Sequence, residues 1–270
     1  MHIKQAVVNF ILCSTIIAIP YQSCARNTIA AHLDAAWYPQ NRTLLTETLQ
    51  NLTTRAAERY DMTINGSTIR AIIVPHAALR YSGVIAAAAY RLVDTTKIDT
   101  IIILAPSHTV AFHGIATSHF DTYEIPIGSI GTATLSKNFL TSPAAQLFHQ
   151  QQNAFQQEHS LEIQLPFIKF FFPQAKILPF IVGNITEKEI ATVAQQLADL
   201  ITPTTLIIVS TDMTHYGTRF SYTPFSDLPL LRVRQLDSNI LHAIQQGSST
   251  ELMKIYSTTR ATICGITPPL

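Results

Sequence analysis

The sequence predicts an α/β fold built on a mostly parallel, doubly wound sheet with helices on both faces. Apolar runs rich in β-branched residues occupy residues 70–74, 100–104 and 204–210, without period-two alternation. Such runs are typical of strands buried on both faces, which belong to parallel sheets. Helical patterns separate the runs, so right-handed crossovers should connect the strands. With 270 residues, of which 47% are hydrophobic, the chain can bury the core of one large domain.

The first 25 residues differ from the rest of the chain. Lys4 precedes an apolar stretch at residues 6–20, and small residues follow it, which is typical of a secretory signal peptide. The stretch is shorter than the roughly 20 residues of a membrane-spanning helix. The alternatives are a lipoprotein with Cys24 as the lipidated residue and an uncleaved anchor. We therefore expect a signal peptide at residues 1–25, a single domain at residues 26–270 that is short at its C-terminus, and a periplasmic or extracellular location.

Charge and motifs exclude several classes of protein. The formal net charge is +1 and Lys and Arg do not cluster, so neither a nucleic-acid partner nor a membrane partner beyond the signal or lipid anchor is expected. The chain has no G-x-S-x-G elbow, no G-x-G-x-x-G and no Walker loop, the motifs of serine hydrolases and nucleotide-binding proteins. Once the signal is removed, Cys264 is the one cysteine left, which rules out a disulfide framework.

Helical periodicity predicts the elements between the first strands. A helix is expected at residues 43–60, because apolar side chains recur there at three- and four-residue spacing: Leu45, Leu49, Leu52 and Ala56. An alanine-rich helix at residues 81–93 follows the first strand, and its small side chains allow a close approach to the sheet. Residues 112–117 and 120–127 fit short strands or loop, whereas residues 128–141 are too polar to assign.

The second half of the chain continues the alternation. Residues 158–172 begin like a helix, but Pro166 would remove a hydrogen bond from its interior, so a kink or break is expected. Thr186 and Glu189 have the spacing of a capping box, which marks a helix start. The remaining elements are a strand at residues 175–182 and helices at residues 186–201, 227–246 and 251–256.

A histidine follows each of three predicted strands. His76 and His108 come just after the first two strands, and Asp212 and His215 follow the run at residues 204–210. Ligands of open parallel sheets bind outside the carboxyl ends of the strands, so we expect these side chains to converge. Imidazole and thiolate ligands suit zinc, copper and iron. With Cys264, the set predicts a transition-metal or catalytic site.

Each of these residues also has a structural interpretation. A single histidine is more often a hydrogen-bonded structural residue than a ligand, and no pair has the spacing of a zinc finger or of H-E-x-x-H. Cys264 fits a small buried hydrophobic residue equally well. The shared position of three histidines at strand ends, His76, His108 and His215, therefore carries the prediction of a site.

A second set of polar residues is predicted to support the site. His159, between Glu158 and Ser160, fits a general acid/base or a hydrogen-bond donor behind a ligand, and the alternative is a helix cap. Glu162, one turn later, is expected to face the same way. The hydroxyl of Ser107 is adjacent to His108, and that of Ser210 lies close to Asp212, so either can donate to a site residue.

Six motifs in this order resemble one known family: IIVPHAALRYSGVIAAAAY, LAPSHTV, EHSLEIQLPF, LPFIVG, VSTDMTHYGTRFSYTPF and TICG. The chain is similar to the MEMO family, called AmmeMemoRadiSam system protein B in bacteria, from Ala35 to Cys264. The resemblance implies a fold akin to the class III extradiol dioxygenases. It also implies an iron or copper site built from His76, His108 and Cys264, with Asp212 and His215 beside it. Zinc is compatible with the same ligand types.

The resemblance further implies partners and a second kind of function. Partners would be those of the AmmeMemoRadiSam system, a radical SAM protein and an AMMECR-like protein. In animals the family is associated with phosphotyrosine peptides, through a surface whose Trp is matched by Trp37. The chain departs from the family pattern at Ala78, at Thr109 and after Gly265. Two hypotheses follow: a metal-dependent redox or oxygenase-like enzyme in which His159, His215 and Asp212 assist catalysis, and a non-catalytic module that holds a metal, peptide or partner protein in the same cleft.

Overall fold

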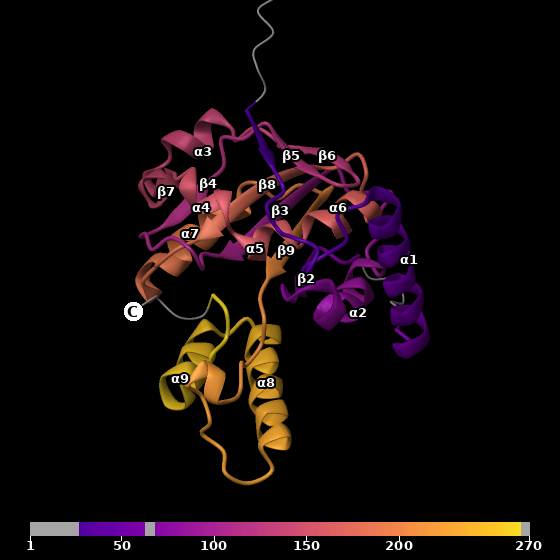
Figure 1. Cartoon of the computed structure of the whole chain (residues 1–270). Coiled ribbons are helices and arrows are strands. Elements are labelled where there is room, and N and C mark those ends of the chain that lie inside the picture. Colours follow the sequence, from indigo (N-terminus) through magenta and orange to yellow (C-terminus); the bar gives the residue numbers. More distant parts are fainter. Residues whose placement is uncertain (1–26, 63–67, 266–270) are drawn as a thin grey trace, which may run out of the picture.

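A computed structural model of the chain describes residues 27–62 and 68–265. The expected signal peptide at residues 1–25 and the expected short C-terminus lie outside these described residues. Within them the chain is a mixed α/β structure with two sheets, as Figure 1 shows. None of the described helices is both long enough and apolar enough to cross a bilayer.

The main sheet confirms the predicted mostly parallel architecture. Its strand order is β2-β9-β3-β8-β4-β7. Neighbouring strands are parallel except for β4, which is antiparallel to β8. The bounds are β2 (Ala71–Val74), β9 (Thr205–Ser210), β3 (Thr100–Pro106), β8 (Lys176–Val182), β4 (Ile115–Thr117) and β7 (Phe148–Gln150). The apolar runs at residues 70–74, 100–104, 175–182 and 204–210 are therefore the four adjacent strands β2, β3, β8 and β9.

A smaller sheet joins the start of the chain to a hairpin. Strand β1 (Thr28–Ala30) is parallel to β5 (Thr122–Ile125), which is antiparallel to β6 (Gly128–Gly131). Neither β1 nor β6 is predicted from the sequence, because three or four residues give no usable hydrophobic period. Helix α3 (Lys137–Thr141) lies in the same unassigned stretch.

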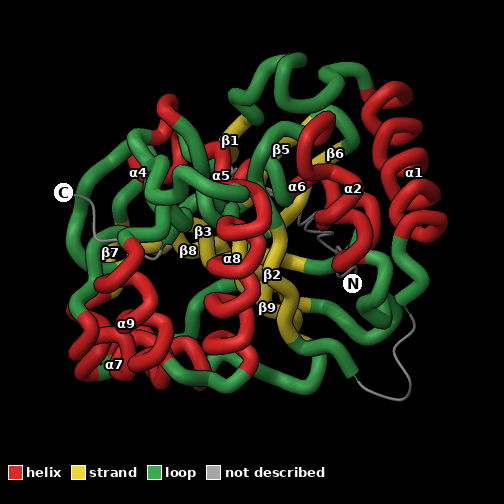
Figure 2. Tube along the Cα trace, turned by 90° about the horizontal axis from the view of Figure 1, so that it is seen from below, coloured by secondary structure: helices red, strands yellow, loops and turns green. Residues whose placement is uncertain are grey.

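Alternating side chains along the central strands bury both faces of the main sheet. Ile101, Ile103 and Ile177 lie in the core that also holds residues of four helices: α1 (Arg42–Arg59), α2 (Leu79–Tyr90), α5 (His159–Glu162) and α6 (Leu165–Phe171). Ile102 and Leu178 lie in a second cluster with residues of α3 and of α7 (Glu187–Ala198). Figure 2 shows α1, α2 and α6 on one side of the strands and α7 on the other. The sheet is thus doubly wound, as predicted.

The C-terminal helices form a separate group beyond the carboxyl ends of the strands. Helix α8 (Pro229–Gln245) and helix α9 (Ser249–Thr259) share a small apolar cluster that includes Leu236, Ile240 and Ile263. In Figure 1 the chain leaves β9 and descends into this group. We call it the α8–α9 lobe. The short turns α4 (Asn153–Gln156), η1 (Pro143–Leu147) and η2 (Thr218–Phe220) complete the described elements.

Helix boundaries follow the predictions, including the break expected near Pro166. The helix expected at residues 158–172 is broken into α5 and α6, and Pro166 lies in the first turn of α6. A proline costs little there, because the first N–H groups of a helix have no intrahelical partner. Helix α9 is longer than the expected 251–256. The capping box of Thr186 and Glu189 opens α7 as predicted.

Candidate metal centre

Three parallel strands deliver the site residues to one edge of the main sheet. His76 lies two residues beyond β2, His108 two beyond β3 and Asp212 two beyond β9. Strand β9 pairs with both β2 and β3, with Val74 beside Ser210 and Leu104 beside Val209. The three strands therefore end side by side, and so do the segments that follow them.

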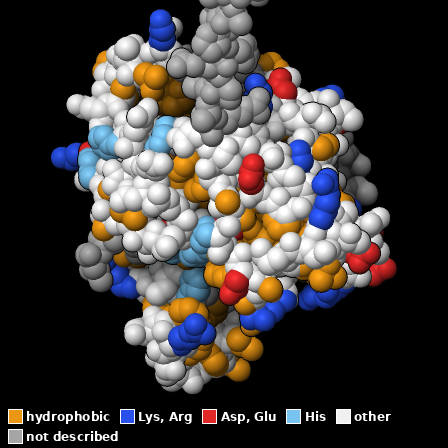
Figure 3. Space-filling model, turned by 45° about the horizontal axis from the view of Figure 1, so that its top comes forward, with side chains coloured by type: hydrophobic (Ala, Val, Ile, Leu, Met, Phe, Trp, Pro, Cys, Tyr) orange, Lys and Arg blue, Asp and Glu red, His pale blue; other side chains and the backbone are white. Residues whose placement is uncertain are grey.

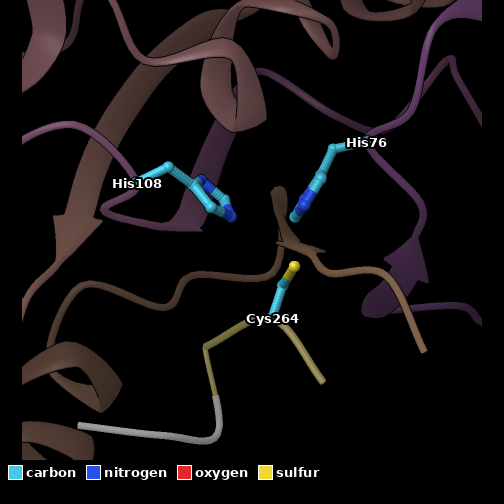
Figure 4. A group of neighbouring side chains, drawn as sticks. All are labelled: His76, His108 and Cys264. Atoms are coloured by element: carbon cyan, nitrogen blue, oxygen red, sulfur yellow. The ribbon is translucent and has the colours of Figure 1, made fainter. Parts of the chain in front are cut away.

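His76, His108 and Cys264 point toward one another, as Figure 4 shows. A ring nitrogen of each histidine and the sulfur of Cys264 all lie within 4.8 Å of one another. The two imidazole rings meet edge to face, with centroids 5.1 Å apart. These three residues come from segments far apart in the sequence, so the fold alone brings them together.

The hydrogen bonds of His76 leave one particular nitrogen free. Its Nδ1 lies 3.2 Å from the hydroxyl of Ser210. That hydroxyl donates its one proton to the carbonyl of Ser160 at 2.6 Å, and it accepts from the amide of Gln164 at 2.9 Å. Because the proton of Ser210 is used, His76 Nδ1 must be the donor. In the neutral ring Nε2 is then unprotonated, and it is the nitrogen available to a metal.

The same logic applies to His108. Its Nδ1 lies 2.8 Å from the carboxylate of Glu158, and its backbone N–H donates to the other oxygen at 2.7 Å. The carboxylate of Glu158 is buried and accepts only, so His108 Nδ1 carries a proton. Nε2 is again the nitrogen left for the space shared with Cys264. A carboxylate behind a histidine is the usual support of a histidine metal ligand.

Asp212 and His215 lie beside this group. One oxygen of Asp212 accepts from the backbone N–H of His76 at 2.8 Å. The other lies 3.8 Å from Nε2 of His76 and 3.7 Å from Nε2 of His215. Nδ1 of His215 donates to the carbonyl of Thr262 at 2.7 Å. All three strand-end histidines therefore hold Nδ1 on a fixed acceptor and turn Nε2 toward the site.

Cys264 is fastened to the loop that follows β9. Its backbone N–H donates to the carbonyl of Asp212 at 3.2 Å, and its carbonyl accepts from the hydroxyl of Thr211 at 2.7 Å. Two residues earlier, the hydroxyl of Thr262 donates to the carbonyl of His215 at 2.5 Å. Because these contacts fix the backbone on both sides, the sulfur is held at the histidines.

The sulfur of Cys264 and the imidazole of His108 shift each other's pKa in opposite directions. Burial raises the pKa of the Cys264 thiol, but the imidazoles of His108 and His76 outweigh it and lower this pKa to about 6. Burial conversely lowers the pKa of His108, while interactions with Cys264 and Glu158 raise it to about 9. In the absence of a metal, the protein therefore holds a thiolate beside an imidazolium at neutral pH. A metal bound at these residues would displace that proton.

His159 lies beside the candidate ligands His76 and His108. Its ring is 4.4 Å from that of His108 and 5.4 Å from that of His76, between centroids. Burial and the nearby charge of His108 lower its pKa to about 4. A second cluster with metal-ligand spacing consists of His108, Glu158 and His159. Figure 3 shows histidine side chains at the surface, in the hollow between the body of the molecule and the lobe below it.

The remaining predicted residues lie at the margin or turn elsewhere. Trp37 is half-buried, with its ring 5.0 Å from that of His159. Glu162, expected to face the site, turns to the N-terminal segment, where it accepts from the backbone N–H groups of His32 and Leu33. The hydroxyl of Ser107 donates to the carbonyl of Val110 at 2.6 Å.

Comparison with known proteins identifies the family of the chain. A family model described as Memo-like protein matches residues 30–270. The chain belongs to the Memo family. Among its relatives, the protein memo-1 homolog of Caenorhabditis elegans is 29% identical and covers 97% of this chain and 75% of its own length. A MEMO1 family protein of Methanosarcina mazei is 31% identical, covering 82% and 78%. Protein MEMO1 of Xenopus laevis is 31% identical, covering 74% and 69%.

Two residues that support the candidate site are not among the predicted ones. Gln164 donates to Ser210 and to the carbonyl of Pro75, and it accepts from the hydroxyl of Tyr90. It is fully buried within an apolar helical stretch. A buried amide requires partners, so a glutamine in such a stretch is a usable signal. Thr262 has no comparable signal, because its partner His215 lies 47 residues away.

Proposed function

We propose that the protein binds one divalent transition metal, iron or copper, at His76, His108 and Cys264, and uses it in redox or oxygenase-like chemistry. The observation that carries the proposal is the convergence of two imidazole nitrogens and one sulfur whose supporting hydrogen bonds are already made. Such donors suit copper, iron and zinc better than magnesium or calcium. Three protein ligands leave coordination positions for a small molecule.

The donor set fits this group of metals by charge as well. Once the extra proton of His108 is displaced, the thiolate of Cys264 and two neutral histidines would present one negative charge to a divalent cation. When bound, iron or copper would supply a one-electron redox couple at the site, whereas zinc would supply only a Lewis acid. Asp212 supports the arrangement, because it holds the backbone of His76 and lies near Nε2 of His215.

His159 is suited to moving a proton. Its lowered pKa, about 4, leaves the ring neutral near pH 7. Nδ1 faces Glu158 at 3.5 Å, so Nε2 is the nitrogen that would accept a proton from a substrate hydroxyl. His215 differs: Asp212 raises its pKa to about 9, partly opposed by burial. It would remain protonated and stabilise negative charge.

Metal content of purified protein tests the first part of the proposal. We expect about one iron or copper ion per chain by elemental analysis, and a loss of most of it in His76→Ala and Cys264→Ser. His242→Ala, an exposed histidine on α8, is the matched control and should bind as the wild type does. Unchanged stoichiometry in both site variants would remove the metal from this site.

Oxygen consumption tests the second part. Protein loaded with iron, copper or zinc would be assayed over a panel of catechols and thiols, with zinc as the redox-inert control. We expect uptake with iron or copper and none with zinc, and a loss of uptake in His159→Ala with metal content retained. Uptake that is equal with zinc, or absent with every metal, would contradict a redox role.

Trp37 supports a second candidate, a peptide- or partner-binding module that uses the same cleft. Its half-buried ring lies on His159 at the margin of the site, and aromatic anchors dominate interfaces. Tyr38 does not contribute, because it is buried with its hydroxyl bonded to Glu162. Titration with a phosphotyrosine peptide should weaken in Trp37→Ala if this function operates. An unchanged affinity would count against it.

The location and partners of the protein are also proposals. The N-terminal apolar stretch supports export, and the family supports a radical SAM protein and an AMMECR-like protein as partners. Fractionation of cells expressing the full chain would test export. Recovery of the protein in the cytoplasm with its first 25 residues intact would exclude it.

A further inference from the structure

A cavity of about 370 Å³ opens beside the candidate metal ligands. His108, Cys264, Tyr256 and Arg260 are among the residues that line it. The last two residues belong to the end of α9, so the cavity lies where the α8–α9 lobe meets the edge of the main sheet. A ligand in this space would touch the metal-binding group and a cationic side chain at once.

Arg260 has an unusual backbone for its residue type. It caps α9 in the left-handed conformation, with φ at 53°. Glycine is the usual residue at such a helix end, because a Cβ atom clashes with the backbone in the left-handed conformation. The guanidinium of Arg260 lies over the ring of Tyr256, 5.7 Å from its centroid.

The guanidinium of Arg260 has no acidic partner among residues 27–62 and 68–265. Arg232, by contrast, pairs with Asp227 at 3.0 Å. The hydroxyl of Tyr256 likewise has no hydrogen-bond partner within the same described ranges. The exposed guanidinium of Arg260 and the half-buried hydroxyl of Tyr256 therefore line the cavity without a protein partner in these ranges.

We propose that Arg260 and Tyr256 bind the carboxylate of a small organic substrate whose reactive part lies at His108 and Cys264. This inference rests on the proposed function for the role of the metal, although the anion subsite itself does not require turnover. The planar guanidinium matches a carboxylate in bidentate geometry. A cavity of about 370 Å³ holds a molecule of the size of benzoate with room for substituents.

Binding of 4-fluorobenzoate, followed by fluorine NMR, tests the subsite on metal-loaded protein. We expect its affinity to fall about fivefold or more in Arg260→Gln, because a charge-assisted hydrogen-bonded pair is lost, and less in Arg260→Lys. The neutral 4-fluorobenzamide should bind weakly and equally to wild type and variant. Arg59→Gln is the matched control, since Arg59 also lies over a neighbouring ring, 5.6 Å from the centroid of Tyr60, in another part of the fold.

Paramagnetic broadening locates the bound probe. The fluorine signal should broaden far more with copper-loaded than with zinc-loaded protein, because the subsite adjoins the metal ligands. Equal broadening in the two forms would place the benzoate elsewhere and overturn the proposal. An affinity for benzoate that is unchanged in Arg260→Gln would overturn it as well.

Two controls separate this inference from folding and from the metal. Arg260→Gly relieves the left-handed backbone, so it should fold at least as well as the wild type and still lose benzoate binding. Elemental analysis of every sample reports the metal independently. If metal-free protein bound benzoate in an Arg260-dependent way and took up no metal, the proposed function would fail while the anion subsite stood.

Discussion

Single hydrogen bonds decide which atoms of the histidines face the candidate metal centre. The hydroxyl of Ser210 accepts from His76 Nδ1 and gives its own proton to Ser160. The carboxylate of Glu158 likewise accepts a hydrogen bond from Nδ1 of His108. In both cases the supporting group lies behind the ring, so it orients Nε2 without occupying the space in front of it.

Ser210→Ala should weaken metal binding without removing a ligand. The variant leaves His76 Nδ1 without its acceptor, and loss of such a partner typically costs about 10–100-fold in metal affinity. Ser107→Ala is the control, because its hydroxyl turns away to Val110 and the affinity should stay near the wild-type value. Competition with a chromophoric chelator measures both. An equal loss in the two variants would show that the effect is not specific to His76.

The thiol of Cys264 should react as a thiolate at unusually low pH when the metal is removed by a chelator. Its pKa falls from an ordinary 9.0 to about 6, because the imidazoles of His108 and His76 overcome the effect of burial. The rate of alkylation by iodoacetamide should therefore rise to its plateau as the pH passes through about 6. Mass spectrometry of the peptide that contains Cys264 gives the rate separately from Cys13 and Cys24.

The variant His108→Ala tests what lowers the pKa of Cys264. In His108→Ala the midpoint should move up, toward the ordinary thiol range, because one of the two lowering interactions is gone. A midpoint near 9 in the wild type would contradict the arrangement of sulfur and imidazoles described above.

The positions of the candidate metal ligands could be predicted from the sequence, but the residues that form hydrogen bonds to them could be predicted only in part. His76 and His108 follow apolar runs, and parallel strands end at one edge. Glu162 was expected beside them because it lies near His159 in sequence. Helix α5 ends at Glu162, however, and the carboxylate meets the N-terminal segment, 124 to 130 residues away. Such partners depend on tertiary contacts that no local pattern encodes.

At the scale of elements, one carboxylate ties the N-terminal segment to α5. Glu162 is buried and accepts from the backbone N–H groups of His32 and Leu33 and from the hydroxyl of Tyr38 at 2.6 Å. The segment it holds carries Trp37, whose carbonyl accepts from the backbone N–H of Leu79 at the start of α2. Glu162 therefore positions the tryptophan against the site from a distance.

Glu162→Gln should loosen this segment. The neutral amide keeps one acceptor oxygen but places an NH2 group against backbone donors, so we expect a loss of about 1–3 kcal/mol in the free energy of unfolding. Urea denaturation measures it. Trp37 is the only tryptophan of the chain, so increased quenching of its fluorescence by acrylamide reports the local effect.

Glu47→Gln provides the control, since Glu47 is exposed on α1 and should change neither quantity beyond the error of measurement. A Glu162→Gln protein that lost stability with unchanged quenching would show that the carboxylate stabilises the fold without positioning Trp37.

Elements with a clear period could be predicted, and elements without one could not. Helix α1 buries Leu45, Leu49, Leu52 and Ala56, the four positions that its spacing indicates. The break between α5 and α6 follows from Pro166, whose ring cannot continue the helix of the preceding residues. Strands β1 and β6 are short and rich in polar or small residues. They form because a neighbouring strand pairs with them, which is a tertiary effect.

At the scale of the whole molecule, the site joins two parts of the fold. His76 and His108 belong to the edge of the main sheet, whereas Cys264 follows α9 and the α8–α9 lobe. The lobe has its own small apolar cluster, separate from the two clusters on the faces of the sheet. The parallel sheet and its edge follow from the sequence, because apolar runs and crossovers define them. No local pattern predicts that the chain returns from α9 to that edge. The one indication in the sequence is Cys264 itself, because its thiolate is a common metal ligand.

A metal at this junction should therefore stabilise the lobe against the sheet. Binding to the folded state alone adds about 2.7 kcal/mol to the free energy of unfolding when free metal is a hundredfold above its dissociation constant. Cys264→Ser should remove this increment while its metal-free stability stays near that of metal-free wild type. Amide hydrogen exchange locates the effect, because metal should slow exchange in α8 and α9 more than in α1, which packs in a separate apolar cluster on one face of the sheet. Equal slowing in all three helices would mean that the metal stabilises only the global fold, and no slowing in α8 and α9 would mean that Cys264 does not tie the lobe to the site.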